Sequence, residues 1–217
     1  MWIQTSAGGI GALAYAPDGR SLYAADSTGH VTEWDTAART RRRTFAIGST
    51  APFGLFCAAG GRFLVARGHA PLIWDLTSGT VHGRLTLDDS DLGYVGSPGS
   101  PRTDPADDTR LLFVSADHSR IRTWDTATRA VGPDFGAWPD HGKLRWFDVS
   151  PDGRFVALVS PDHAGKVALV ERATGRPLRS FDFALGRRAL CVCFSPDGLT
   201  CAVGGSNKRF AVFDVDL

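Results

Sequence analysis

The chain has 217 residues, of which 43% are hydrophobic, and a formal net charge of +1 from 24 basic and 23 acidic side chains. That length is ample to enclose a core. The balanced charge argues against nucleic acid, which needs a basic stripe, and against an anionic membrane. No apolar run is long enough to cross a bilayer, and the N-terminus lacks the basic start of a signal peptide. We therefore expect a cytoplasmic protein.

Turn signals recur along the chain at a regular spacing. "APDG" ends at residue 19, and "SPDG" ends at residues 153 and 198. Proline presets φ, aspartate can bond its own backbone, and glycine accepts a positive φ, so these tetrapeptides predict tight turns. "AAGG" and "ADDT" hold the matching places at residues 61 and 109. The separations from 19 to 61, 109, 153 and 198 are 42, 48, 44 and 45, the period of a four-stranded propeller blade.

Two predicted strands follow each turn. The first is short and nearly continuously apolar, as a strand is when both faces of its sheet are covered: "RSLYAA", "RFLVAR", "RLLFVS", "RFVALV" and "LTCAVG". The second ends in a large residue and an acid: "HVTEWD", "PLIWD", "RIRTWD", "KVALVE" and "RFAVFD". We expect the large residue to fill space between neighbouring sheets, so that an aromatic ring is favoured there.

With its period, its Pro-Asp-Gly turns and its Trp-Asp endings, the chain resembles a WD-repeat β-propeller over essentially its whole length. The resemblance implies an all-β fold, a single five-bladed propeller of four-stranded antiparallel blades. The blades are expected at 7–48, 49–87, 88–136 and 137–183, and the fifth at 184–217 together with 1–6. The His-Ser-Trp-Asp network of that family is complete in no repeat, since Thr28, Gly68 and His118 stand where its turn aspartate belongs.

The last repeat stops one strand short, while a strand-like piece, "MWIQT" (residues 1–5), precedes the first repeat. We expect residues 2–5 to pair beside residues 210–214, which would close the ring and remove an exposed sheet edge. A closed ring would be a monomer. The alternative is an open arc completed by oligomerisation or by another chain.

Histidines gather in one set of predicted turns. His30, His69, His118 and His163 lie between the second and third strands of their repeats, and His141 lies in a loop at the same end. They could form a metal site, a pH-sensitive partner surface, or turns that satisfy local backbone groups. Packed sheets stand about 10 Å apart, so side chains from successive blades would have to lean far inward to share a metal ion. We therefore expect the turn role, with no metal and no cofactor. The four cysteines are expected to be small buried hydrophobes.

In the family that the chain resembles, partners commonly dock on this loop end. The matching positions are Phe53, Arg67, Asp117, Lys143, Arg145, His163 and Arg188. Four of the seven are basic, which favours an acidic or phosphorylated peptide. The alternative interpretation is a set of solvated surface charges.

Two further segments depart from the repeat pattern. Residues 88–109, rich in Gly, Pro, Ser and Asp, are expected to hold a short strand near residues 92–95 and then a long loop, either functional or disordered. The run "ARTRRR", with Arg39, Arg41, Arg42 and Arg43, is expected in an outer hairpin as a solvated rim.

No catalytic motif stands out, although a propeller hydrolase could gather acids such as Asp91 and Asp148, or His141, at its axis. A buried Asp in a first strand could equally bond a neighbouring blade's backbone. The leading hypothesis is a non-enzymatic protein interaction scaffold. The alternatives are a fragment or subunit of a larger propeller assembly and a propeller hydrolase with a central-channel site. The Ala, Arg, Gly and Asp richness suggests a bacterial source with GC-rich DNA.

Overall fold

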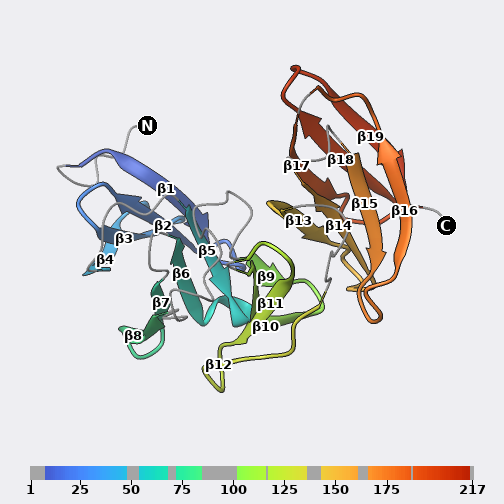
Figure 1. Ribbon diagram of the computed structural model, residues 1–217. Helices are drawn as coiled ribbons and strands as arrows, with labels where there is room; N and C mark the ends of the chain where they lie inside the picture. The colour runs from blue at the N-terminus through green and yellow to red at the C-terminus, as the bar shows by residue number, and fades with distance from the viewer. Residues whose placement is uncertain are drawn as a thin grey trace. The chain divides into compact units, whose positions relative to one another are not determined.

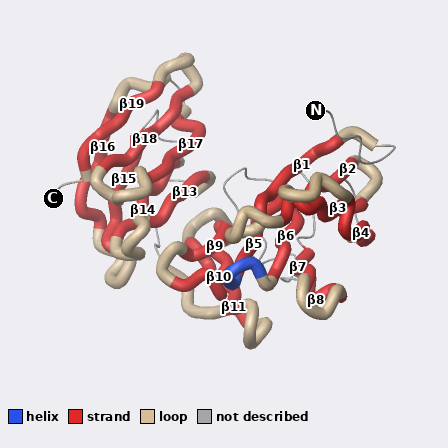
Figure 2. The backbone as a smooth tube through the Cα atoms, turned by 180° about the vertical axis from the view of Figure 1, so that it is seen from behind, coloured by secondary structure: helices blue, strands red, loops and turns tan. Residues whose placement is uncertain are grey.

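The computed structural model describes residues 8–47, 54–67, 72–84, 102–115, 117–135, 143–160, 166–186 and 188–215. They form an all-β structure of five antiparallel sheets (Figure 1). The helical content of these residues is one short 3-10 turn, η1 (Ala59–Gly61), seen as the blue segment of Figure 2. The all-β fold class predicted from the sequence is confirmed.

Each sheet takes its strands from one stretch of chain, in sequence order. Sheet 1 holds β1 (Ile10–Tyr15), β2 (Ser21–Asp26), β3 (His30–Asp35) and β4 (Arg41–Ala46). Sheet 2 holds β5 (Gly54–Ala58), β6 (Phe63–Arg67), β7 (Leu72–Asp75) and β8 (Thr80–Arg84). Sheet 3 holds β9 (Arg102–Asp104), β10 (Asp107–Val114), β11 (Ile121–Asp125) and β12 (Ala130–Val131). Sheet 4 holds β13 (Trp146–Val149), β14 (Phe155–Val159), β15 (Lys166–Glu171) and β16 (Pro177–Asp182). Sheet 5 holds β17 (Ala189–Phe194), β18 (Thr200–Gly205) and β19 (Phe210–Asp214).

The chain divides into two compact units, Met1–Thr86 with sheets 1 and 2 and Leu87–Leu217 with sheets 3, 4 and 5. The division falls beside the predicted boundary between the second and third repeats. Within each unit, neighbouring sheets share a hydrophobic core. One core joins sheets 1 and 2, a second joins sheets 3 and 4, and a third joins sheets 4 and 5.

The Pro-Asp-Gly turns have the conformation that their residues predict. Gly19, Gly153 and Gly198 have φ values of 70°, 72° and 74°, the left-handed region that glycine enters most readily. In each turn the glycine N–H donates to the carbonyl three residues earlier, at distances between 2.8 and 2.9 Å. The turns therefore connect the first and second strands of sheets 1, 4 and 5 in the same way.

One backbone hydrogen bond recurs in all five sheets. The residue after the Trp-Asp position donates its N–H to a carbonyl at the start of the second strand: Thr36 to Arg20, Leu76 to Arg62, Thr126 to Thr109, Arg172 to Arg154 and Val215 to Leu199. The five distances lie between 2.9 and 3.1 Å. The five repeats inferred from the sequence thus share one local geometry.

In the second repeat, the tryptophan packs between two neighbouring sheets. The ring of Trp74 on β7 stacks on the ring of Phe45 on β4, with centroids 4.6 Å apart. The indole N–H groups of Trp34 and Trp74 are buried without a hydrogen-bond partner among the described residues. That agrees with the incomplete His-Ser-Trp-Asp network, and packing rather than hydrogen bonding holds these rings.

The third repeat corrects a prediction. The strand that pairs with β10 in the first-strand position is β9 (Arg102–Asp104), joined to it by a turn at Pro105 and Ala106. The long loop expected at that point is wrong, because Asp104 Oδ1 accepts the N–H of Ala106 at 3.0 Å and closes a tight turn at once. The strand expected at 92–95 lies outside the described residues.

Two other predictions also need correction. Of the four cysteines only Cys201 is buried, while Cys57 is half-buried and Cys191 and Cys193 are exposed. The arginine run is not a simple solvated rim. Arg43 Nε lies 2.5 Å from the buried carboxylate of Glu33, and its guanidinium donates to the carbonyl of Leu76 in sheet 2. Because Glu33 and Leu76 lie within its reach, Arg43 ties two sheets together.

Candidate functional site

Four of the predicted site residues lie at the end of the sheets formed by the turns between the second and third strands and by the loops that precede the first strands. Asp117 lies in the turn between β10 and β11, Lys143 and Arg145 lie just before β13, and Arg188 lies just before β17. All four are exposed. Phe53, His163 and the side chain of Arg67 lie outside the described residues.

Hydrogen bonds fasten part of this end together. The N–H of Leu144 donates to the carbonyl of His118 at 2.8 Å, and His118 Nδ1 lies 2.9 Å from the carbonyl of Leu144. This link places the Asp117 turn of sheet 3 beside Lys143 and Arg145. We call the surface formed by Asp117, Lys143 and Arg145 the loop-end surface.

Arg188 belongs to a separate link. Its carbonyl accepts the N–H of Ser206 at 2.9 Å, and its own N–H donates to Ser206 Oγ at 3.2 Å. These bonds hold Arg188 against the β18–β19 turn of sheet 5. Among the described residues, one link brings Asp117, Lys143 and Arg145 together, and a second link holds Arg188.

Asp117 has a structural role in its turn. Its carboxylate accepts Ser115 Oγ at 2.5 Å, and Ser119 Oγ and N–H at 2.6 and 3.0 Å. These hydrogen bonds, led by that from Ser115, lower the pKa of Asp117 from 3.8 to about 2. The carboxylate is therefore ionised at neutral pH and fixes the turn. Its side chain is still 57% exposed, so a partner can reach it.

Contrary to expectation, the side chains of the two described turn histidines do not bond local backbone groups: one contacts a side chain and the other a carbonyl 26 residues away. His30 Nδ1 lies 2.9 Å from Thr28 Oγ1, and His118 bonds the Leu144 carbonyl. His118 also has a φ of 59°, in the left-handed region where His is enriched. His69, His141 and His163 lie outside the described residues. Among the described residues, no three His, Cys, Asp or Glu side chains are grouped so as to hold a metal ion.

Asp148 on β13 bonds both neighbouring sheets. Its Oδ1 lies 2.6 Å from Arg102 Nη1 on β9, and its Oδ2 accepts the N–H of Phe194 on β17 at 2.8 Å. Burial raises its pKa, and Arg102 opposes that rise. The expectation that a buried aspartate here bonds a neighbouring backbone is confirmed. Asp91, the companion candidate, lies outside the described residues.

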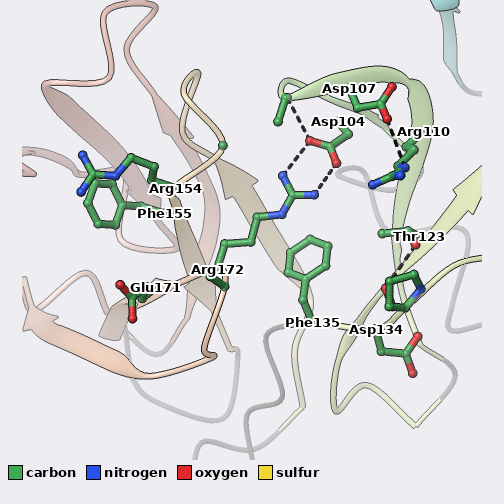
Figure 3. Close-up of a pocket in the computed structure, with 14 residues that line it drawn as sticks. Asp104, Asp107, Arg110, Thr123, Asp134, Phe135, Arg154, Phe155, Glu171 and Arg172 are labelled. Atoms are coloured by element: carbon green, nitrogen blue, oxygen red, sulfur yellow. Dashed lines mark hydrogen bonds and ion pairs between the residues drawn. The ribbon is translucent and has the colours of Figure 1, made fainter.

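A pocket of about 710 Å³ opens between sheets 3 and 4, on the side of the turns that follow their first and third strands (Figure 3). Its cause is the outer strand of sheet 3, since β12 has two residues whereas β4 and β16 each have six. After β12 the chain runs through Gly132 and Pro133, and Phe135 bridges back to Ile121. Among the described residues, the space beside this short strand stays open.

Arg172 occupies the floor of this pocket. Its guanidinium makes a two-pronged ion pair with Asp104, with Nη1 2.8 Å from Oδ1, and lies 4.6 Å from the ring centroid of Phe135. Figure 3 shows it pointing at Asp104, with Phe135 beside it. Asp104 is 1% exposed. The pair joins β9 to the turn after β15, so it clamps sheet 3 to sheet 4.

The other charges in the pocket are also engaged. Asp107 pairs with Arg110, and Asp134 pairs with Arg122, at distances of 3.1 and 3.0 Å. Arg154 lies 5.1 Å from the ring centroid of Phe155. The described residues that line the pocket include no His, Cys, Ser or Lys, so they supply no familiar nucleophile and base pair.

Sequence reasoning missed this pocket because no motif marks it. Two weak signals were available. The third repeat breaks the regular spacing, and Arg172 stands at the position where the first and third repeats have Thr36 and Thr126. In those repeats the threonine hydroxyl donates to a carbonyl of its own sheet, Gly19 or Thr109. The long Arg172 side chain reaches the next sheet instead.

Comparison with known proteins leaves the family open. The chain matches no protein-family model, and no curated protein matches it. None of the described helices is long and apolar enough to cross a membrane.

Proposed function

We propose that the chain is a WD-repeat-like β-propeller that works as a non-enzymatic scaffold for protein binding. The recurrent hydrogen bond after each Trp-Asp position and the shared Pro-Asp-Gly turns support the repeat part of this proposal. The structural use of Asp148 and of the pocket charges supports the non-enzymatic part. We place the protein in the cytoplasm, since all four cysteines carry free thiols, which suits a reducing compartment.

The proposed ring is closed by sheets 1 and 5. On the face of sheet 1 that turns away from sheet 2, large apolar side chains of β1 are exposed, while Ala24 and Thr32 on the same face are buried. Leu13 and Tyr15 on β1 are 58% and 65% exposed there. Tyr15 pairs across the strands with Leu22, and Leu22 pairs with Trp34, so these side chains share one face. A sheet of a closed propeller would bury such a face against the preceding blade.

Sheet 5 carries a matching face. Phe210 and Val212 on β19 are 77% and 59% exposed. They pair across the strands with Gly204 and Ala202, which pair with Cys191 and Cys193 in turn. Sheet 5 also has three described strands where the other sheets have four. We propose that residues 2–5 pair with β19 and that the two apolar faces pack together in a monomer.

Substituting Leu13 tests closure in the full chain. If the ring closes, Leu13→Asp places a charge in a buried interface and lowers the free energy of unfolding by about 2–4 kcal/mol. If Leu13 stays exposed, the change is within about 0.5 kcal/mol. Val81→Asp, at a 46% exposed position on outer strand β8, is the matched control. Equal, small effects of the two substitutions in urea unfolding would contradict closure.

A larger assembly is the second candidate, because the same two faces could be covered by another copy of the chain. Light scattering separates the two arrangements. The closed monomer has a mass near 23.2 kDa, whereas an assembly gives a multiple of that mass that falls on dilution.

The loop-end surface is the proposed docking site, and the link between His118 and Leu144 carries this part of the proposal. It holds the exposed Lys143 and Arg145 on a fixed backbone beside the Asp117 turn. Cations carried on a held backbone segment suit an acidic or phosphorylated peptide. In a closed ring Arg188, and the predicted Phe53, Arg67 and His163, would extend this surface.

An array of phosphoserine peptides, with their serine and glutamate counterparts, tests the docking site. We expect phosphopeptides to bind best, and their binding to weaken as salt rises. The double substitution Lys143→Glu and Arg145→Glu should reduce binding at least about tenfold. Arg176→Glu, at an exposed arginine after β15 that is 69% exposed, should leave it unchanged. Binding lost equally in both variants, or no peptide bound at all, would count against the proposal.

A further inference from the structure

Two thiols project from one face of strand β17. Cys191 and Cys193 are both exposed, whereas Cys201 on β18 is buried. Residues two apart on a strand lie on the same face, with Cα atoms about 6.8 Å apart. That spacing is at the upper limit for a disulfide, so the two sulfurs are better suited to bridging by a third atom than to direct bonding.

The strand opposite the two thiols leaves room above them. Cys193 pairs across with Ala202, and Cys191 pairs across with Gly204. A Cβ atom built on Gly204 would lie 2.8 Å from Cys191 Sγ, a distance that side-chain atoms do not adopt. Glycine therefore admits this thiol in its present place, and a larger residue would displace it.

The neighbouring groups decide which ion these thiols suit. No third His, Cys, Asp or Glu of the described residues joins them, so the four-coordinate site that zinc prefers is lacking. Soft thiolate ligands select Cu(I), which needs few ligands. With metal–sulfur distances of about 2.3 Å, a linear bridge spans about 4.6 Å, and each side chain leans about 1 Å toward the other.

A nearby turn supplies positive charge. Lys208 and Arg209 in the β18–β19 turn are exposed, and Gly205 donates its N–H to the Arg209 carbonyl at 2.9 Å, beside Gly204. A cation held by two thiolates has a net charge of −1, which these two side chains would stabilise.

We propose that Cys191 and Cys193 form a two-coordinate site for a soft monovalent cation, Cu(I). On binding, each thiol releases its proton to solvent and forms one metal–sulfur bond, with no change of oxidation state. The site lies on the face of sheet 5 that the proposed ring closure would cover, so copper would reach it only in the open form of the chain. Metal binding and closure would exclude each other.

Anaerobic titration of the full chain with Cu(I), in competition with a chelator, tests the site. In the open form, reached with Leu13→Asp if the wild type is closed, we expect one equivalent to bind, with an ultraviolet charge-transfer band from thiolate to copper. Cys191→Ser and Cys193→Ser should each lose this complex, and Cys57→Ser should retain it. The complex persisting in Cys193→Ser, or being lost in Cys57→Ser, would overturn the proposal.

Parallel labelling with a disulfide reagent separates this proposal from ring closure. Shielded thiols in the wild type, with Cu(I) binding only in Leu13→Asp, would support both. Reactive thiols and Cu(I) binding in the wild type would support the site and contradict closure. Reactive thiols without Cu(I) binding, or thiols shielded in both proteins, would overturn the site.

Discussion

The aspartate of each Trp-Asp pair caps a turn, and the ring of Trp74 packs against a neighbouring sheet. Asp35, Asp75 and Asp125 each accept two backbone N–H groups from the residues two and three places later, at 2.7 to 3.1 Å. Glu171 holds this place in the fourth repeat and bonds Thr174 Oγ1 instead. The repeated phrase therefore encodes a local turn that any sheet of the fold can use.

Removing one of these caps should destabilise the protein measurably. We expect Asp125→Ala to lower the free energy of unfolding by about 1 kcal/mol, because two N–H groups of the turn lose their acceptor. Glu171→Ala is the matched control and should cost less, since the Glu171 carboxylate accepts a hydroxyl and not the two backbone N–H groups. Urea unfolding measures both, and an equal cost would contradict the capping role.

The pH dependence of the Asp117 turn follows from its lowered pKa. Its folded-state pKa of about 2 lies below the ordinary value of 3.8. The ionised carboxylate therefore contributes stability above about pH 4 that is lost as pH falls toward 2. Asp117→Asn lacks this contribution, so the difference in unfolding free energy between the two proteins should shrink across this range. A constant difference in urea unfolding from pH 7 to pH 3 would argue against it.

Among the elements, the hairpins are those whose positions were predicted correctly from the sequence. The Pro-Asp-Gly turns and the strands after them agree with the structure because their conformations depend on residues close in sequence. The short outer strand β12 and the turn at Pro105 were not predicted. Arg172 and Asp104, 68 residues apart, meet only because sheets 3 and 4 pack together.

Removing one partner of the ion pair that clamps these sheets should lower the free energy of unfolding. Arg172→Met leaves Asp104, 1% exposed, as an uncompensated buried charge, and we expect it to cost about 3 kcal/mol or more. The same substitution in an Asp104→Asn background should cost much less, because the two residues are coupled.

A double-mutant cycle in urea measures this coupling. Arg110→Met is the control, since its pair with Asp107 is 45% and 36% exposed and should contribute less than about 1 kcal/mol. Additive costs for Arg172 and Asp104 would contradict the clamp.

At the scale of the whole molecule, the described residues leave exposed apolar side chains on two sheet faces and an unpaired edge on one strand. They lie on sheets 1 and 5, the first and last of the chain. A closed ring would cover all three at once, whereas the cores within each unit leave Leu13, Tyr15, Phe210 and Val212 exposed among the described residues. The proposal therefore joins observations that no single sheet explains.

Deleting residues 1–6 tests the proposed closing strand. Without it the edge of β19 would stay open, so we expect a sharply lower melting temperature and association that grows with concentration. Calorimetry and light scattering measure the two effects. An unchanged melt would rule out closure by this segment, while the Leu13 and Val81 variants report separately on the packing of the two faces.

The amino-acid sequence by itself determined the all-β class, the five repeats, the tight turns and the acids that cap them. Each of these depends on φ preferences, on alternation along a strand, or on a side chain that bonds the backbone two or three residues away. Only the tertiary structure decided where the pocket opens, which arginines join sheets, and which cysteines are exposed. Those features depend on which residues face one another across packed sheets. Such residues are far apart along the chain, so local sequence patterns do not encode their contacts.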